Sequence, residues 1–437
     1  MSTESVGVRI YGKEDLRLER FELPEPADDE IVAQIVSNSI CMSSHKAAEQ
    51  GADHKRVPDD VAENPTIVGH EFAGRILEVG EKWADQFEEG QKFAIQPALM
   101  YKGSLDAPGY SFETIGGNSQ RVVIPKEVMI QDCLLPYEGD AYFKASLAEP
   151  MSCTVGAFEA AYHTPPGTHE HVMGIKEGGN TALLASCGPM GLSAIDMALY
   201  GPKQPERLLV TDIDPDRLAR AERIFPPEEA AEAGIELEFI NPNELDGGPD
   251  SLPQYVDEMT DGEMMHDVFV FAPVAPLVEQ ADKLLGRDGC FNFFAGPSDR
   301  DFEATINFYD VHYEGHHVMG TSGGTTDDMR LALDLMGRGQ VDPAHMITHV
   351  GGLNSVVDTI LDLPDIPGGK KLVYVGREMP MTPLAELGQR AEEAEEPLKS
   401  IYKELDRLVK RNDGVWNAEA EEFLLSRDEL KFGLEAE

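Results

Sequence analysis

The sequence predicts an N-terminal β domain, a parallel α/β domain of the doubly wound type, and a helical segment at the C-terminus. Between Val6 and about Ile124, short stretches rich in β-branched residues are separated by many glycines and prolines. From about Gly178, apolar strands alternate with helical stretches, the pattern of a parallel sheet with right-handed crossovers. After Thr382 the composition becomes helical and charged. A chain of 437 residues is also too long for one ordinary core, so two or three domains are expected.

The β domain is expected to span residues 1–165 and 345–380 and to be partly barrel-like. Its clearest strands are residues 31–36 and residues 121–124, and the second of these ends at Pro125. Residues 371–375 form a further apolar stretch, and we expect this last strand to return to the first domain. The loops between such strands commonly carry functional side chains.

The α/β domain is expected to span residues 166–344. Its strands are predicted at residues 181–185, 207–211, 268–271 and 290–294. A helix is predicted through residues 192–199, directly after a glycine-containing turn that follows the first of these strands.

Residues 381–437 are expected to form a helical C-terminal extension. Apolar residues recur there at alternating intervals of four and three, from Leu387 to Leu408. Pro397 would break one continuous helix, so we predict two short helices with Pro397 in the first turn of the second. Asn417 is the predicted N-cap of a final helix that runs through Leu425. We expect this extension to pack its apolar stripe on its own chain or on a partner subunit.

The chain is strongly acidic, with 36 Lys and Arg against 80 Asp and Glu and a formal net charge of −44. Such a surface repels nucleic acids and anionic membranes, so neither is expected as a partner. The five cysteines are widely spaced and odd in number, which argues against a disulfide framework. The first residues lack the pattern of a signal peptide, and no apolar run reaches membrane-spanning length. We therefore expect a cytoplasmic protein.

A nucleotide-binding turn is predicted at Ser186-Cys-Gly188-Pro-Met-Gly191, a G-x-G-x-x-G pattern with serine in its first position. The turn follows a strand, opens a helix and precedes Asp212 by about twenty residues, so amide donors at the helix N-terminus would face a pyrophosphate. The alternative is a tight strand–helix turn with an exposed aspartate. The residues expected to bind the cofactor are Ser186, Gly188, Pro189, Met190, Gly191, Asp212 and Arg217.

The cofactor is expected to be NAD(H) rather than NADP(H). The Asp212 carboxylate can accept hydrogen bonds from ribose hydroxyls and would repel a 2′-phosphate. Arg217 could instead pair with a phosphate, which leaves the choice of cofactor open to that extent.

Metal-capable side chains occur at Cys41, His70, Glu71 and Glu149. Each has an ordinary explanation alone: a small buried thiol for Cys41, a surface pair for His70 and Glu71, and a carboxylate at a helix start for Glu149. Together, a thiolate, an imidazole and a carboxylate are an appropriate ligand set for zinc with one position open for substrate.

These motifs resemble the zinc-containing medium-chain dehydrogenases. Cys41 with Ser43, Gly69-His-Glu-Phe-Ala-Gly74, Glu149-Pro150 and Gly188-Pro-Met-Gly191 occur in the order of that family, and residues 6–376 are covered. The chain looks like the polyol branch, where glutamate replaces a cysteine ligand. Segments at residues 41–44, 51–55, 131–136 and 416–420 further resemble the L-sorbose 1-phosphate reductase-like group. The resemblance implies a GroES-like catalytic domain, a Rossmann domain and a homodimer or homotetramer.

The resemblance also implies one catalytic zinc per subunit, held by Cys41, His70 and either Glu71 or Glu149. The remaining glutamate would lie close by, as an exchanging ligand or a supporting group. Many relatives hold a second, structural zinc with four cysteines, but residues 96–120 contain none, so a single metal site is expected. The family often has an aspartate directly after the relay serine or threonine, whereas Ser44 follows Ser43 here, with His45 next.

The implied function is reversible hydride transfer between NAD(H) and a polyol or sugar phosphate. Ser43 would pass the substrate proton outward, through ribose hydroxyls and to His45. For a phosphorylated substrate, Lys46, Lys55 and Arg56 are candidate anion contacts, although each would ordinarily be a solvated charge. The alternatives are a zinc dehydrogenase for a free polyol or threonine, and a non-catalytic nucleotide-binding protein of the same fold.

Overall fold

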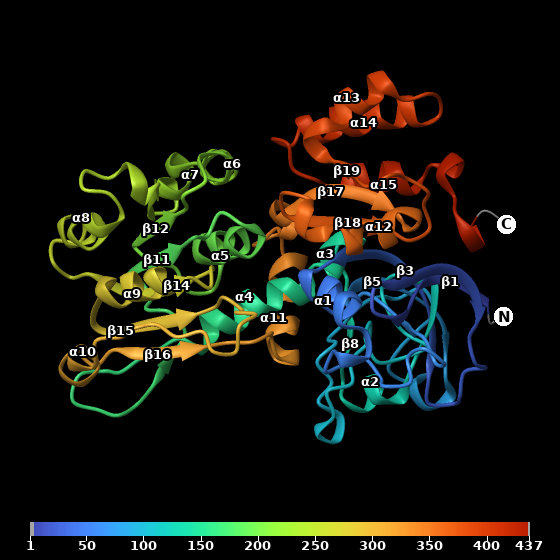
Figure 1. The fold of residues 1–437 in the computed structure, drawn as a ribbon, viewed down its shortest axis with the longest axis horizontal. Helices are drawn as coiled ribbons and strands as arrows, with labels where there is room; N and C mark the ends of the chain where they lie inside the picture. Colours follow the sequence, from blue (N-terminus) through green and yellow to red (C-terminus); the bar gives the residue numbers. More distant parts are fainter. Residues whose placement is uncertain (1–3, 436–437) are drawn as a thin grey trace. The chain divides into compact units, whose positions relative to one another are not determined.

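The computed structural model describes residues 4–435, and the chain folds into two compact units (Figure 1). Unit 1 comprises Met1–Glu149 and Ile347–Glu437, and unit 2 comprises Pro150–Met346. The sequence analysis placed the boundary between the β domain and the α/β domain between residues 165 and 166. In the structure, the chain passes from unit 1 to unit 2 within helix α4 (Ala148–Ala160). The C-terminal helices, which the sequence set apart as an extension, are part of unit 1.

Unit 1 is the predicted β domain. Its eight-stranded sheet has the order β19-β17-β18-β3-β5-β6-β8 with β7 also paired to β3, and a smaller sheet joins β2, β1 and β4. The strands are β1 (Glu4–Gly12), β2 (Asp15–Glu22), β3 (Ile31–Ile40), β4 (Thr66–Ile67), β5 (Glu71–Val79), β6 (Lys92–Ile95), β7 (Arg121–Ile124), β8 (Leu134–Pro136), β17 (Ile347–Gly352), β18 (Lys370–Tyr374) and β19 (Thr382–Pro383).

Strand β3 is the centre of this sheet, because it pairs antiparallel with β5, β7 and β18. Its β-branched residues Ile31 and Ile35 are almost fully buried, as the predicted strand at residues 31–36 requires. The expected strand at residues 121–124 is confirmed as β7. The returning strand is confirmed as β18, which places a segment from the far end of the chain beside β3.

The helices of unit 1 flank these strands. They are α1 (Met42–Gln50), α2 (Lys126–Ile130), α3 (Tyr142–Ser146), α12 (Val356–Leu361), α13 (Leu387–Glu393), α14 (Leu398–Lys410) and α15 (Ala418–Leu425). The predicted interruption at Pro397 is confirmed, although Pro397 is the N-cap residue of α14 and not part of its first turn. Asn417 caps α15 as predicted, since its side-chain oxygen accepts the backbone N–H of Ala420 at 3.0 Å.

The C-terminal segment is tied into unit 1 by a buried polar network. Trp416 is fully buried, and its indole N–H donates to the Tyr374 hydroxyl at 2.9 Å. That hydroxyl donates to Glu421 Oε2 at 2.9 Å. Glu421 also accepts the backbone N–H groups of Tyr142 and Phe143, at 2.6 and 2.8 Å, which lie at the start of α3. The apolar stripe of the extension also packs within its own chain, since Leu387 and Leu405 are fully buried.

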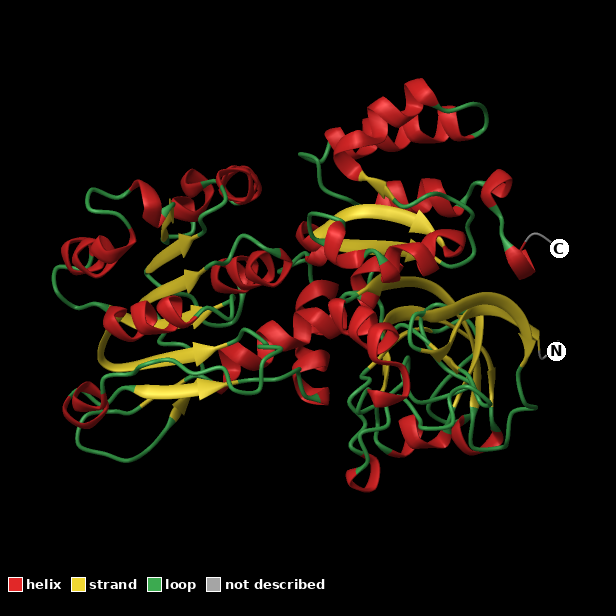
Figure 2. Cartoon of the chain, viewed as in Figure 1, coloured by secondary structure: helices red, strands yellow, loops and turns green. Residues whose placement is uncertain are grey.

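Unit 2 is the predicted parallel α/β domain. Its six strands are all parallel in the order β13-β12-β11-β14-β15-β16, which is the 3-2-1-4-5-6 order of a Rossmann sheet. Figure 2 shows these strands interleaved with helices. The sheet strands are β11 (Asn180–Leu184), β12 (Arg207–Thr211), β13 (Glu236–Ile240), β14 (Met265–Val270), β15 (Leu285–Phe293) and β16 (His317–Gly320).

The helices of unit 2 connect consecutive strands. They are the remainder of α4, followed by α5 (Pro189–Tyr200), α6 (Pro215–Ile224), α7 (Pro227–Glu232), α8 (Leu252–Met259), α9 (Ala275–Leu284), α10 (Phe308–Tyr313) and α11 (Thr326–Gly337). The predicted strand at residues 207–211 is confirmed as β12, and the other three predicted strands overlap β11, β14 and β15 with shifted ends. The predicted fold class is therefore confirmed.

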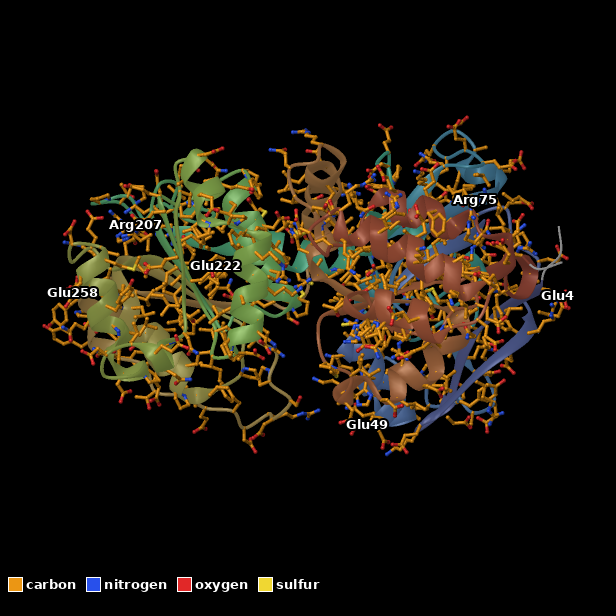
Figure 3. The ribbon with its side chains drawn as sticks, turned by 90° about the horizontal axis from the view of Figure 1, so that it is seen from above. Glu4, Glu49, Arg75, Arg207, Glu222 and Glu258 are labelled. Carbon is orange, nitrogen blue, oxygen red and sulfur yellow. The ribbon has the colours of Figure 1, made fainter. Side chains whose placement is uncertain are left out.

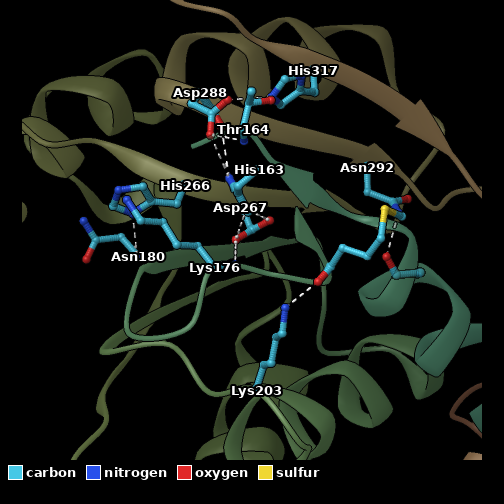
Figure 4. Close-up of polar contacts among 12 residues, drawn as sticks. His163, Thr164, Lys176, Asn180, Lys203, His266, Asp267, Asp288, Asn292 and His317 are labelled. Carbon is cyan, nitrogen blue, oxygen red and sulfur yellow. Dashed lines mark hydrogen bonds and ion pairs between the residues drawn. The ribbon is translucent and has the colours of Figure 1, made fainter. Parts of the chain in front are cut away.

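A polar network lies at the amino ends of β14, β15 and β16 (Figure 4). His163, on the short strand β9 (Tyr162–His163) that pairs with β10 (Val172–Met173), has Nε2 3.1 Å from Asp267 Oδ1. Its Nδ1 lies 3.1 Å from the backbone carbonyl oxygen of Asp288. The Asp288 side chain accepts from His317 Nε2 at 2.9 Å and from the Thr164 N–H at 2.8 Å. These contacts tie β9 to the sheet.

A cavity of about 1230 Å³ opens beside this network and is lined by His163, Asp288 and His317, among other residues. Its walls include Met264 and Leu285, at or just before the first residues of β14 and β15. The cavity is therefore at the opposite end of the parallel strands from the carboxyl ends, where nucleotides bind in such sheets.

Charged side chains cover the surfaces of both units. Figure 3 labels Glu49, Glu222 and Glu258, all of which are exposed. Within residues 4–435, no helix combines the length and the apolar character that crossing a lipid bilayer requires.

Candidate metal and nucleotide sites

The pairing of β3 with β5 brings the predicted metal ligands together. Ser39, near the end of β3, lies opposite Glu71, the first residue of β5. Residues just after β3 therefore come close to residues just before β5. Cys41 is the N-cap residue of α1, directly after β3. His70 directly precedes β5, after a turn in which Gly69 has φ +99°, a conformation that favours glycine.

Cys41, His70 and Glu71 each present a ligand atom, and these three atoms all lie within 4.8 Å of one another. His70 and Glu71 are 4% and 1% exposed. Burial lowers the pKa of His70, so its imidazole is neutral and can act as a metal ligand. Burial raises the pKa of the Cys41 thiol, which a bound cation would reverse. A sulfur, a nitrogen and an oxygen donor at this spacing fit zinc.

Both carboxylate oxygens of Glu71 have partners within unit 1. Oε2 accepts from the Ser39 hydroxyl, and Oε1 forms a buried ion pair with the Lys370 ammonium group on β18. Burial alone would raise the pKa of Glu71, but the nearby positive charge of Lys370 lowers it below the usual value. The pair is therefore ionised. To bind a metal, the Glu71 carboxylate would have to break its ion pair with Lys370 or contact the metal and Lys370 at the same time.

Sequence reasoning missed Lys370. The available signal was the pair Lys370-Lys371 at the start of the apolar strand predicted at residues 371–375. A buried lysine requires an acidic partner, because an ammonium group without one carries a large desolvation penalty. The identity of that partner depends on the pairing of β18 with β3, which brings Lys370 to Glu71 across 299 positions of the chain.

Glu149 lies in the first turn of α4. Burial is the main cause that raises the pKa of Glu149 to about 7. His70 lowers this pKa, whereas Glu71 and Cys41 raise it further. The Glu149 carboxyl group therefore interacts electrostatically with the other three side chains. Among residues 4–435, the structure brings the ligand atoms of Cys41, His70 and Glu71 within 4.8 Å of one another, a set that does not include Glu149.

Three hydroxyl groups surround the His70 imidazole. Ser43 Oγ lies 3.2 Å from Nε2 and donates to Cys41 Sγ at 3.1 Å. The Tyr110 hydroxyl also lies 3.3 Å from Nε2, whereas Ser44 Oγ lies 3.4 Å from Nδ1 on the other side of the ring. Ser43, the predicted proton acceptor, is therefore in contact with two of the predicted metal ligands.

Tyr110 is a second residue that sequence reasoning missed. Its ring centroid is 4.8 Å from that of His70, and the side chain is 2% exposed. Gly109 has φ +80°, and a Cβ at this position would lie 2.0 Å from the carbonyl oxygen of Gly69. Two glycine backbones thus meet without side chains, and this close approach brings Tyr110 against His70.

His45 is held apart from the metal cluster. Its Nδ1 donates to the carbonyl oxygen of Ile360 on α12 at 2.8 Å. Among residues 4–435, no hydrogen bond joins His45 to Ser43. The predicted transfer of a proton from Ser43 to His45 is therefore not a direct one in this arrangement.

The predicted nucleotide turn lies between β11 and α5 in unit 2. A Cβ at Gly191 would lie 1.9 Å from the Ser186 carbonyl oxygen, so only glycine permits this tight turn. A Cβ at Gly188 would meet no atom within 4 Å, so the backbone is open on this side to a close-approaching ligand. Gly188 is the N-cap residue of α5, whose first amide groups and dipole favour an anion such as a pyrophosphate.

Asp212 directly follows β12, next to this turn. Its Oδ2 accepts the backbone N–H of Cys187 at 3.0 Å, and its Oδ1 accepts that of Asp214 at 3.1 Å. The side chain is thereby fixed at the carboxyl edge of the sheet. Arg217 lies in the first turn of α6, and its Nε is 3.5 Å from Asp214 Oδ2. The structure thus places Arg217 with Asp214, and the turn residues with Asp212.

Known proteins resemble this chain over nearly its whole length. Residues 27–135 match the family model of the alcohol dehydrogenase GroES-like domain. Mannitol-1-phosphate 5-dehydrogenase of Aliivibrio fischeri is 49% identical over 423 residues, which cover 97% of this chain and 98% of that protein. L-sorbose 1-phosphate reductase of Klebsiella pneumoniae is 49% identical over 435 residues, with coverage of 97% and 98%.

A solved structure supports the fold. The 2R,3R-butanediol dehydrogenase of Bacillus subtilis superimposes with a TM-score of 0.67 at 20% identity, covering 85% of this chain and 99% of that one.

Proposed function

The chain belongs to the zinc-containing medium-chain dehydrogenase family, and we propose that it catalyses reversible hydride transfer between NAD(H) and a polyol or sugar phosphate. The observation that carries the proposal is the cluster of Cys41, His70 and Glu71 in unit 1, with the Ser43 hydroxyl against it and the Glu149 carboxyl group in electrostatic interaction with it. A protein that only binds nucleotides would have no need of this donor set. The two relatives at 49% identity are both named for oxidoreductions of phosphorylated sugars or polyols.

Cys41, His70 and one carboxylate would hold the metal, and zinc bound there supplies a Lewis acid for the substrate oxygen. The Glu71 oxygen is the one that lies within 4.8 Å of the other two ligand atoms, but we assign the carboxylate ligand to Glu149, because Glu71 is already paired with Lys370. If Glu71 turned to the metal, the buried Lys370 ammonium would lose the partner that balances its desolvation. Glu71 then acts as a fixed negative charge behind the ligands, held by Ser39 and Lys370.

Ser43 would accept the proton of the substrate hydroxyl at its Oγ and pass its own hydroxyl proton on to the ribose hydroxyls of the cofactor, because Oγ lies beside both Cys41 and His70. Ser44 would hold the His70 ring by its Nδ1 and leave Nε2 directed at the cluster. The burial of His70 and Glu71 excludes water from the rear of the site, which strengthens the electrostatic interactions there.

NAD(H) is the proposed cofactor. The Asp212 carboxylate is held in place by two backbone N–H groups and would repel the 2′-phosphate of NADP(H). Arg217, the residue that could compensate, pairs with Asp214. The nicotinamide carries the hydride, while Gly188 and the N-terminus of α5 bind the pyrophosphate.

The test compares the purified protein with Cys41→Ala and His70→Ala. We expect about one zinc per subunit in the unmodified protein, loss of zinc in both variants, and a fall in turnover of at least about 10²–10³-fold. Metal analysis and the absorbance of NADH measure the two effects. Cys133→Ala is the matched control, since Cys133 is a buried cysteine elsewhere in unit 1. Full zinc content and turnover in Cys41→Ala or His70→Ala would refute the proposal.

A further inference from the structure

Arg56 is a cation beside the metal cluster, and no acidic side chain among residues 4–435 forms an ion pair with it. Its guanidinium carbon lies 5.4 Å from the centroid of the Tyr110 ring, and the hydroxyl of that ring lies 3.3 Å from His70 Nε2. One aromatic ring therefore separates the guanidinium group from the proposed zinc ligand. Within the part of the chain that the structure describes, no ion pair joins Arg56 to a carboxylate, and its buried Nε has no hydrogen-bond partner.

The backbone around Arg56 is fixed. Its N–H donates to His54 Nδ1 at 3.3 Å, and its carbonyl oxygen accepts the Ser111 hydroxyl at 2.7 Å. The His54 ring stacks on Tyr110, with centroids 5.6 Å apart and an interplanar angle of 14°. The His54 ring and the Arg56 guanidinium group thus both lie against the Tyr110 ring.

The surroundings of Arg56 are electropositive in an otherwise acidic protein. The chain has 80 acidic residues and 36 Lys and Arg. Other arginines of unit 1 form ion pairs with neighbouring carboxylates, as Arg17 does with Asp15, and Arg56 differs from them in this respect. Burial lowers the pKa of His54, and so do the positive charges of Arg56, Lys55 and Lys46. A cationic corner of this kind attracts an anion.

We propose that Arg56 binds the phosphate group of a phosphorylated polyol or sugar-phosphate substrate, and that this contact selects phosphorylated over free substrates. The inference rests on the proposed function and narrows its substrate class. The planar guanidinium group carries five N–H donors in a fork that matches phosphate oxygens. A free polyol would leave the buried Nε–H without a partner, so the site favours the substrate that supplies one.

The test measures kcat/KM of the zinc-loaded enzyme for mannitol 1-phosphate and for mannitol. We expect the unmodified enzyme to prefer the phosphate. In Arg56→Gln the ratio of the two values should fall roughly 10- to 100-fold, mainly through the KM of the phosphorylated substrate, as expected for the loss of a charged hydrogen-bond donor. Inorganic phosphate should compete with mannitol 1-phosphate in the unmodified enzyme and bind more weakly to Arg56→Gln.

Lys126→Gln is the control, because it removes an equal charge from an exposed residue on α2, elsewhere in unit 1. We expect it to change the ratio by less than about threefold, as for a solvated charge. An equal fall in Lys126→Gln would overturn the inference, because the effect would then belong to the general field of the protein. Zinc content reports whether each variant folds. If Arg56→Gln loses zinc, the same ratio of kcat/KM values is measured for Arg56→Lys. This variant keeps the positive charge but loses the forked donors, so its preference for the phosphorylated substrate should still fall in part.

The inference and the proposed function fail in different ways. If the zinc-loaded enzyme oxidises both substrates with equal kcat/KM, the inference is wrong and the proposed function stands. If it oxidises neither with NAD, the proposed function is wrong, and the inference falls with it.

Discussion

Replacing Glu421 with alanine should strongly destabilise unit 1. The Glu421 side chain is 3% exposed and accepts three hydrogen bonds: from the backbone N–H groups of Tyr142 and Phe143, and from the Tyr374 hydroxyl. Alanine leaves all three donors without their acceptor in the interior. It also removes the carboxylate that satisfies the first amide groups of α3, which immediately precedes the helix that carries Glu149.

The size of the effect follows from these contacts. A buried donor left without a partner costs about 1–3 kcal/mol, so three donors would cost about 3–9 kcal/mol if none regained a partner. Water that enters the space of the lost side chain will satisfy part of them, so we expect a loss of about 3–5 kcal/mol. That is a large fraction of the roughly 5–15 kcal/mol that stabilises a typical domain.

Urea unfolding followed by tryptophan fluorescence is a suitable assay. The chain has two tryptophans, Trp83 and Trp416, and both lie in unit 1, so the signal follows this unit. With a dependence of about 3 kcal/mol per molar urea, the midpoint should fall by on the order of 1 M. The control is Glu422→Ala, at the adjacent exposed position, with an expected change within about 0.5 kcal/mol. Equal midpoints for the two variants would refute the reasoning.

Two further predictions concern the fold. Gly109→Ala should destabilise unit 1 by about 2–5 kcal/mol, because the new Cβ would lie 2.0 Å from the Gly69 carbonyl oxygen. The control is Gly103→Ala, which has the same φ of +80° but lies in open space and should cost only about 1–2 kcal/mol. Equal urea midpoints for the two variants would contradict this prediction. Burial lowers the pKa of His163, but the hydrogen bond and the charge of Asp267 outweigh this effect and raise it above the usual value. The pair therefore stabilises unit 2 fully at pH values below the unfolded-state pKa of about 6.5. This stabilisation is lost as the pH rises through the raised pKa of the folded state. His163→Gln should therefore lower the unfolding midpoint, measured by circular dichroism, more at about pH 6 than at about pH 9, and an equal loss at both would show that the charge of His163 is unimportant.

Much of the fold could be predicted from local pattern. The strand β12 has the predicted bounds, and Asn417 caps α15 as expected, because both depend on residues within a few positions of one another. The end of unit 1 within α4 could not be predicted in this way. That helix is continuous across the boundary, so no turn or change of composition marks it in the sequence.

The sequence by itself determined which residue types were available for chemistry: one thiol, one imidazole and two carboxylates in the motifs around Cys41, His70 and Glu149, and a glycine turn before Asp212. Only the tertiary structure decided how they are supported. Lys370 reaches Glu71 through strand pairing across about 300 positions, and Tyr110 reaches His70 because two glycine backbones meet. Contacts between residues so far apart in the chain depend on the packing of the whole domain, and no local pattern encodes them.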